Sequence, residues 1–460
     1  RKEHEPTDAQ EAELDLFLSD CQPNNFSHIF TLTKHLKRLQ QRLDLLNAQS
    51  RKERHQDRIK FLQDDPHRRK AFKAIKGKGA PPLLFVKRTD GQITTIPAEV
   101  DEEVRNAYAP YYHGNISGSL VHHAVSFFSK YRSYIFSGPI FEIEPLTGQD
   151  LLDQCTHGPY TAGGLDGWSP EDFSILSLNC FSLLAMLLNG IEEGLPWPSG
   201  LLHGKASFLS KSDTPSSDPL KYRILLLLPT LYRRWGSTRL KHLKPWIDSW
   251  TLEGMYAGIP GQGAEDAWWL TSLIMESATL ADKKLSGGAV DMLKCFDSIN
   301  RVLAIMVLQA AGMPPRIVRA YKNYHDNVSV YNSLAGGLGK PYSKRCSIPQ
   351  GCPFSMLIIA LMMRPWILLC NIDGLINARV LADDLLLLGV GTGHLQPFVT
   401  AFSRTHEFLH DMGARISAEK SFIFSNDSGI RCWLKQQWWP HLRLSLIHIS
   451  EPTRPRLISY

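Results

Sequence analysis

Two apolar segments decide the fold that this sequence predicts, GGAVDML at residues 287–293 and RVLADDLLLLG at residues 379–389. Short apolar runs between glycine and polar residues are typical of buried β-strands. The second run is interrupted by Ala-Asp-Asp, which indicates a tight hairpin with acids at its tip. We therefore expect three carboxylates at strand ends, on Asp291, Asp383 and Asp384.

Carboxylates in apolar surroundings resist desolvation and repel one another, so such a cluster is stable only when a cation neutralises it. Oxygen ligands on rigid strands suit Mg²⁺, and two such ions about 3.5–4 Å apart stabilise the attacking and leaving oxygens of a phosphoryl transfer. The three acids are then expected to lie within a few ångströms of each other. The alternative is structural, with Asp291 as a strand-end cap and Asp383-Asp384 as an ordinary turn.

The surrounding sequence alternates strand-like and helix-like segments, which predicts an α+β fold. YRILLLLP at 222–229 is a strand candidate, and helices are expected from about Phe173 to Leu188 and from about Gln396 to Met412. Ser169 is a candidate N-cap with Pro170 at the first helical position. Asp90-Gly91 predicts the turn of a small hairpin.

The composition is that of a globular chain. Of its 460 residues, 43% are hydrophobic and 21% are charged. There is no start methionine or signal peptide, and no apolar run is long enough to span a bilayer, so we expect no membrane partner. The eight cysteines form no CxxC pair, which favours a reducing, intracellular compartment over a disulfide framework or a zinc site.

Positive charge is concentrated near the beginning of the sequence. Residues 34–78 carry 15 Lys/Arg against 5 Asp/Glu, an excess of +10 within a net charge of +6. Leucines at 32, 36, 39, 43 and 46 predict an amphipathic helix there, and GKGAPP at 77–82 predicts a linker. The basic block is either a solvated helix face or a sequence-independent contact with nucleic-acid phosphates.

Residues from about 160 to 435 resemble the fingers and palm of reverse transcriptases, most closely those of non-LTR (LINE-type) retrotransposons. VDMLKCFDSIN at 290–300 is similar to the first palm motif. The resemblance implies that Asp291 binds metal beside the Met292 carbonyl, and that Phe296 is the steric gate that excludes a ribose 2′-hydroxyl. Its alternative role is a core phenylalanine. LADD is similar to the aspartate-pair motif, although Leu381 stands where the family often has an aromatic residue.

Further motifs extend the resemblance. SIPQGCPFS at 347–355 is similar to the second palm motif, which implies that Gln350 and Gly351 lie along the nascent base pair. FLSK and YRIL resemble fingers segments whose basic residues hold the incoming triphosphate, here Lys211 and Arg223; each is alternatively a solvated surface charge. MGARISAEKS resembles the fourth palm motif, in which Lys420 would protonate the leaving pyrophosphate.

The resemblance implies a right-hand polymerase with an antiparallel palm sheet. We expect an N-terminal linker region at 1–130, helical and basic at 34–78; a helical region at 131–200; fingers and palm at 201–435; and a truncated thumb start at 436–460. The implied reaction is RNA-directed DNA synthesis with two Mg²⁺ ions, Mn²⁺ being a substitute. The implied partners are an RNA template, a DNA primer or target and dNTPs, and the expected place of action is the nucleus.

Two other functions are kept open. One is an RNA-dependent RNA polymerase, which a large side chain at Phe296 disfavours; the other is an inactive retroelement fragment that only binds nucleic acid. LSLIHISEPTR at 444–454 matches the translation of a common sequencing adapter, so we expect residues 444–460 to be foreign to the natural gene.

Overall fold

The computed structural model describes residues 82–437 except 115–117, 157–160, 213, 335–336 and 372–373, together with residues 449–450 and isolated positions between 41 and 56. The chain divides into two compact units, residues 1–79 and 80–460. In the first unit the described positions are helical. The predicted leucine stripe and most of the basic block lie outside the described residues.

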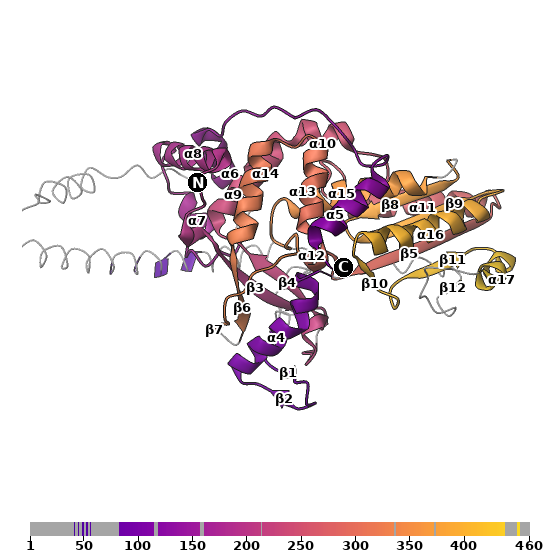
Figure 1. The fold of residues 1–460 in the computed structure, drawn as a ribbon, viewed down its shortest axis with the longest axis horizontal. Coiled ribbons are helices and arrows are strands. Elements are labelled where there is room, and N and C mark those ends of the chain that lie inside the picture. Colours follow the sequence, from indigo (N-terminus) through magenta and orange to yellow (C-terminus); the bar gives the residue numbers. More distant parts are fainter. Residues whose placement is uncertain are drawn as a thin grey trace, which may run out of the picture. The chain divides into compact units, whose positions relative to one another are not determined.

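The second unit contains two principal sheets (Figure 1). The large sheet has the order β12-β11-β5-β9-β8, with β10 also pairing with β5, and the small sheet has the order β4-β3-β6-β7. The large-sheet strands are β5 (Leu285–Leu293), β8 (Ile376–Leu381), β9 (Asp384–Val390), β10 (Arg415–Ile416), β11 (Phe422–Ser425) and β12 (Ile449–Ser450). The small-sheet strands are β3 (His203–Ser210), β4 (Tyr222–Leu227), β6 (Ser329–Leu334) and β7 (Gly337–Leu338).

Strand pairing is antiparallel except between β3 and β6 and between β11 and β12. A separate hairpin joins β1 (Val86–Lys87) to β2 (Ile93–Thr94). Gly91, in its turn, has a φ of 89°, a conformation that glycine adopts without steric cost. The predicted Asp90-Gly91 turn is therefore confirmed.

Helices form most of the rest of the second unit. They are α4 (Pro97–Tyr112), α5 (Leu120–Tyr131), α6 (Gly148–Thr156), α7 (Pro170–Phe173), α8 (Leu178–Glu193), α9 (Thr230–His242), α10 (Lys244–Trp250), α11 (Ala264–Leu280), α12 (Cys295–Ser298), α13 (Arg301–Ala310), α14 (Pro315–Asn327), α15 (Ser355–Cys370), α16 (Leu395–Asp411) and α17 (Ser428–Gln436), with 3₁₀ turns η1 (Ser199–Leu201) and η2 (Pro219–Lys221). None of the described helices has the length and apolar character needed to cross a bilayer.

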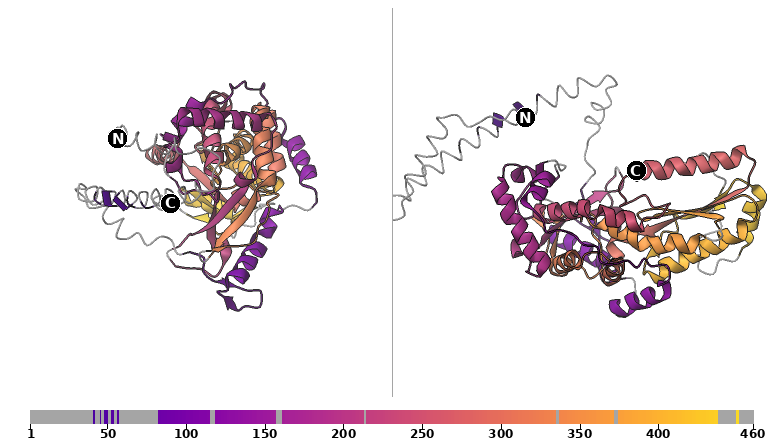
Figure 2. Two further views of the ribbon diagram at one scale, coloured as in Figure 1. Left: turned by 90° about the vertical axis from the view of Figure 1, so that its left-hand side faces the viewer. Right: turned by 90° about the horizontal axis from the view of Figure 1, so that it is seen from above.

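The two faces of the large sheet are covered by different helices. α15 and α16 pack on one face, and α11 lies on the other, as Figure 2 shows from above. Gly288 of β5 permits close approach of α16, because a Cβ there would meet the rings of Phe398 and Phe402. Gly287 leaves room for the ring of Phe424 on the neighbouring strand β11.

α4 packs against β6 of the small sheet and against α12, which follows β5. Its Asp101 is buried and accepts hydrogen bonds from Asn332 of β6 at 2.9 Å and from the Lys340 backbone N–H at 3.0 Å. α4 belongs to the same compact unit as both sheets.

Most predicted elements coincide with observed ones, including β4, β5, the β8–β9 hairpin and α16. The single helix expected from Phe173 to Leu188 is wrong, because the chain forms α7 and α8 with a break between them. Ser169 caps α7 as predicted, in a capping box with Asp172. Ser177 then caps a new helix by accepting a hydrogen bond from the Cys180 N–H, so a second N-terminus begins where one continuous helix was expected.

Candidate active site

Strand register brings the predicted acids together at one end of the large sheet. Asp291 of β5 is the Cα partner of Asp384, the first residue of β9. Leu381 pairs with Asp384, so Ala382 and Asp383 form the two-residue turn of the β8–β9 hairpin. Ala382 has a φ of 58°, a left-handed conformation that residues with a Cβ adopt at a cost and that often marks functional sites.

The acids of the hairpin disturb one another's ionisation. Burial, followed by the neighbouring charges of Asp384 and Asp291, raises the pKa of Asp383 to about 6 from its ordinary 3.8. Burial and the charge of Asp291 also raise the pKa of Asp384. Both carboxyl groups hold their protons more tightly than isolated aspartates do, because water and nearby positive charges stabilise their ionised forms too little.

Three basic side chains predicted from the sequence lie around these acids. Lys420 Nζ is 3.3 Å from Asp291 Oδ2, and its side chain remains 61% exposed. Arg223 is an exposed residue of β4, and its charge partly opposes the rise in the pKa values of Asp383 and Asp384. The pKa of Lys211 is lowered by partial desolvation and by the charges of Lys420 and Arg223. The negative charges of Asp291 and Asp383 act in the opposite direction. The structure thus gathers cations from two sheets beside the acids.

The main chain of Asp291 is held by a serine that sequence reasoning did not select. The Asp291 N–H donates to Ser421 Oγ at 3.2 Å, and Ser421 Oγ donates to the Ser417 carbonyl at 2.7 Å. The Ser417 N–H in turn donates to the Asp291 carbonyl at 2.9 Å. Ser421 follows Lys420 directly, and that adjacency was the only available signal in the sequence.

Phe296 and Met292, both in the first predicted motif, are largely buried. Phe296 lies in α12 and is 6% exposed, and its carbonyl accepts a hydrogen bond from the Ile348 N–H at 2.9 Å. Met292 lies in β5 next to Asp291, with its side chain 2% exposed. The gate function of Phe296 and the metal contact of the Met292 carbonyl stay predictions.

Gln350 and Gly351 lie against β4 of the small sheet. The Leu226 N–H donates to the Gln350 carbonyl at 2.7 Å. Gly351 has a φ of 113°, and a Cβ there would collide with the Leu226 carbonyl. Glycine is therefore required for this contact within the protein, whereas the predicted contact with a nascent base pair stays a prediction.

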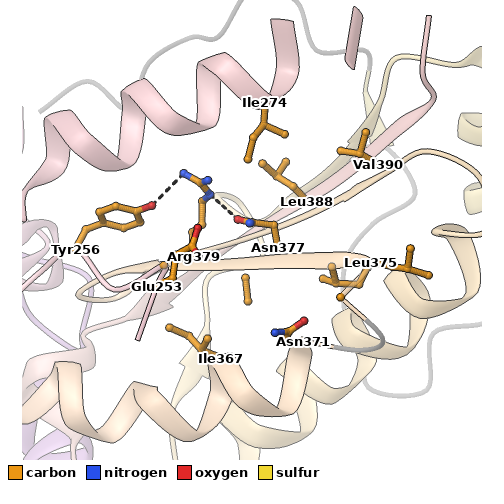
Figure 3. A pocket seen from close by; sticks show the side chains of 14 residues that line it. Glu253, Tyr256, Ile274, Ile367, Asn371, Leu375, Asn377, Arg379, Leu388 and Val390 are labelled. Carbon is orange, nitrogen blue, oxygen red and sulfur yellow. Dashed lines mark hydrogen bonds between the residues drawn. The ribbon is translucent and has the colours of Figure 1, made fainter. Parts of the chain in front are cut away.

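The hairpin that bears the acids is supported along its outer strand (Figure 3). Arg379 of β8 donates from Nε to Asn377 Oδ1 at 2.6 Å and from Nη1 to Tyr256 Oη at 3.1 Å. The Tyr256 N–H donates to the Val380 carbonyl, and the Val380 N–H donates to the Gly254 carbonyl. A cavity of about 390 Å³ lies beside these residues, away from the hairpin tip. The segment at 254–256 therefore acts as a brace for β8.

The donor set fits divalent cations such as Mg²⁺. Within the described ranges, no three His, Cys, Asp or Glu side chains form a ready-made metal cage. Mg²⁺ does not need one, because it is commonly bound by one or two carboxylates together with waters and substrate phosphates. Asp291 and Asp384 face each other across two strands, and Asp383 adjoins them. The raised pKa values of Asp383 and Asp384 fit a site at which a divalent cation would compensate the carboxylate charges.

Paired acids beside a group of cations have the chemistry of sites that bind divalent ions and phosphate-bearing substrates. Residues 210–439 match the family described as reverse transcriptase (RNA-dependent DNA polymerase). The chain belongs to this family, which confirms the family that the sequence predicted.

A relative of the non-LTR type also matches. The chain is 28% identical over 159 residues to the "Retrovirus-related Pol polyprotein from type-1 retrotransposable element R2" of Bradysia coprophila. The match covers 33% of this chain and 18% of that polyprotein, so the chain spans less than a fifth of its relative's length. The similarity supports the predicted non-LTR origin.

Proposed function

We propose that this chain copies RNA into DNA by adding dNTPs to the 3′ end of a DNA primer. The register pairing of Asp291 with Asp384, with Asp383 in the adjoining turn, is the observation that carries the proposal. In this assignment the large sheet is the polymerase palm and the small sheet belongs to the fingers. The template is RNA and the primer is a DNA end, which in the parent element is a nicked chromosomal target in the nucleus.

Each charged group then has a defined task. Two Mg²⁺ ions, or Mn²⁺ in their place, would be held by Asp291, Asp383 and Asp384 and would neutralise charge on the transferred phosphate. Arg223 and Lys211 bind the triphosphate, and Lys420 donates a proton to the departing pyrophosphate. Most of the rate enhancement comes from positioning and charge compensation, as is general for phosphoryl transfer.

Primer extension on an RNA template tests the proposal directly. The unmodified chain should incorporate dNTPs in the presence of Mg²⁺, and Asp383→Asn should not. Binding of primer–template without extension would instead establish a fragment that only binds nucleic acid. Extension with rNTPs in preference to dNTPs would establish an RNA polymerase.

The assignment of Phe296 as a steric gate is tested with the sugar. Phe296→Ala should admit rNTPs by removing the bulk that opposes a 2′-hydroxyl, while dNTP incorporation continues. Phe354→Ala is a matched control, because it deletes a buried aromatic ring of the core that has no assigned contact with nucleotide. Unchanged dNTP selectivity in Phe296→Ala would assign that residue to the core alone.

A further inference from the structure

The corner between β5 and α12 contains a residue in an unusual backbone conformation. Lys294 lies between Asp291 and Phe296 in sequence, and its φ is 51°. Side chains with a Cβ rarely occupy this left-handed region, so surrounding interactions must stabilise it. The interactions of the Lys294 side chain supply that stabilisation.

The Lys294 ammonium group contacts two other segments of the chain. Its Nζ donates to Tyr108 Oη at 2.6 Å and to the Tyr222 carbonyl at 2.6 Å. It also lies 4.8 Å from the centroid of the Tyr108 ring. Hydrogen bonds from a charged donor are stronger than neutral ones, and the aromatic face adds a further attraction for the cation.

These contacts join α4 to both sheets. Tyr108 is a fully buried residue of α4, and its hydroxyl lies 3.1 Å from the carbonyl oxygens of both Pro219 and Tyr222. Tyr222 begins β4 and directly precedes Arg223. One ammonium group therefore links the end of the strand that carries Asp291 to the start of the strand that carries Arg223.

We propose that Lys294, with Tyr108, is a positioning residue that sets the location of Arg223 relative to the acids of the large sheet. This inference rests on the proposed polymerase function and extends it to residues outside the matched segment, because Tyr108 precedes residue 210. We call the contacts of Lys294 Nζ with Tyr108 and the Tyr222 carbonyl the tether. Loss of the tether leaves Arg223 and the acids present but displaces Arg223 from the triphosphate. Binding of dNTP is then weakened more than the chemical step.

Steady-state primer extension on an RNA template tests the tether. Lys294→Met keeps the length of the side chain and removes its donors, and it should raise KM for dNTP about tenfold while changing kcat less than about twofold. Tyr108→Phe removes only the hydroxyl and should raise KM about threefold. The double variant should resemble Lys294→Met, because both substitutions remove one shared interaction.

Lys221→Met is the matched control, since it removes an exposed positive charge next to Tyr222 without touching the tether. It should leave KM unchanged. A second readout needs no turnover: the upward shift of the unfolding temperature produced by dTTP should be smaller for Lys294→Met than for Lys221→Met.

Three results would each overturn the tether. The first is a fall in kcat at constant KM in Lys294→Met. The others are additive effects of Lys294→Met and Tyr108→Phe on KM, or equal effects of Lys221→Met and Lys294→Met on KM. Such results in a chain that extends primers leave the polymerase function standing. An unmodified chain that extends no primer, yet shows the predicted difference in the dTTP shift, overturns the polymerase function and retains the tether.

Discussion

Glu192 of α8 and the acids of the β8–β9 hairpin are both shielded from solvent, fully in the first case and partly in the second, and their surroundings differ in kind. Glu192 of α8 is fully buried, and Oε1 accepts hydrogen bonds from Trp235 at 2.8 Å and Arg239 Nε at 2.7 Å, while Oε2 accepts one from Arg239 Nη2 at 2.6 Å. Asp383 and Asp384 lie beside each other and beside Asp291, and the pKa values of both are raised.

The difference separates a charge that is compensated within the protein from charges that are not. Both carboxylate oxygens of Glu192 accept hydrogen bonds from the protein, so this acid is part of the packed core. The ionised acids of the hairpin repel neighbouring carboxylates, so their placement costs stability in the folded chain, and a bound divalent cation would reduce this cost. Substitutions in the two regions should therefore have opposite consequences for stability and activity.

The largest effect is expected in the hairpin. Asp384→Asn should lower primer extension by about 10³-fold, because it removes a charged oxygen that the transferred phosphate's cations require. Stability without metal should not fall, since the substitution also removes a repelling charge. Thermal unfolding and primer extension on the same preparation check both parts. A large loss of stability would show that the acid has a structural role.

Glu192→Gln should produce the reverse pattern. It leaves the buried Arg239 guanidinium without its carboxylate and should lower the free energy of unfolding by about 3 kcal/mol. Denaturant titration measures this change. Activity per folded molecule should remain near that of the unmodified chain, and Glu193→Gln on the exposed neighbouring position should be nearly neutral.

A smaller effect concerns pH in the absence of divalent ions. Because the folded chain raises the pKa of Asp383 to about 6 from 3.8, the folded state binds more protons than the unfolded state between these values. The contribution of this group to stability is therefore greatest at low pH and decreases by about 3 kcal/mol as the pH rises from about 4 to just above about 6. Comparing unmodified chain with Asp383→Asn across this range isolates the contribution, and parallel curves would contradict it.

The smallest effect is expected at the turn. Ala382→Gly should raise the free energy of unfolding by about 0.5 kcal/mol, because glycine adopts a φ of 58° without strain but gains entropy when unfolded. Ala378→Gly in the adjoining strand is the control, and it should destabilise the chain because that residue is buried in regular β-structure. Equal changes at the two positions would show that the turn is not strained.

Sequence patterns predicted the parts of the site that depend on local structure. The apolar runs on either side of Asp291 and of Asp383-Asp384 predicted both strands, and the motif order predicted which distant cations would join them. Lys294 and Ser421 were not found, because their contacts depend on tertiary packing and not on spacing. The break between α7 and α8 was missed for a different reason: Ser177 had to be chosen as a cap within an otherwise continuous apolar pattern.

The two-residue turn at Ala382-Asp383 also restricts how the length of the hairpin can change during evolution. Side chains alternate between the faces of a sheet, so a single-codon insertion in β9 would send each later residue to the opposite face. A slip of one position between β5 and β9 would likewise end the pairing of Asp291 with Asp384. Deletions and insertions in this hairpin should consequently be far rarer in active elements than substitutions of its apolar residues.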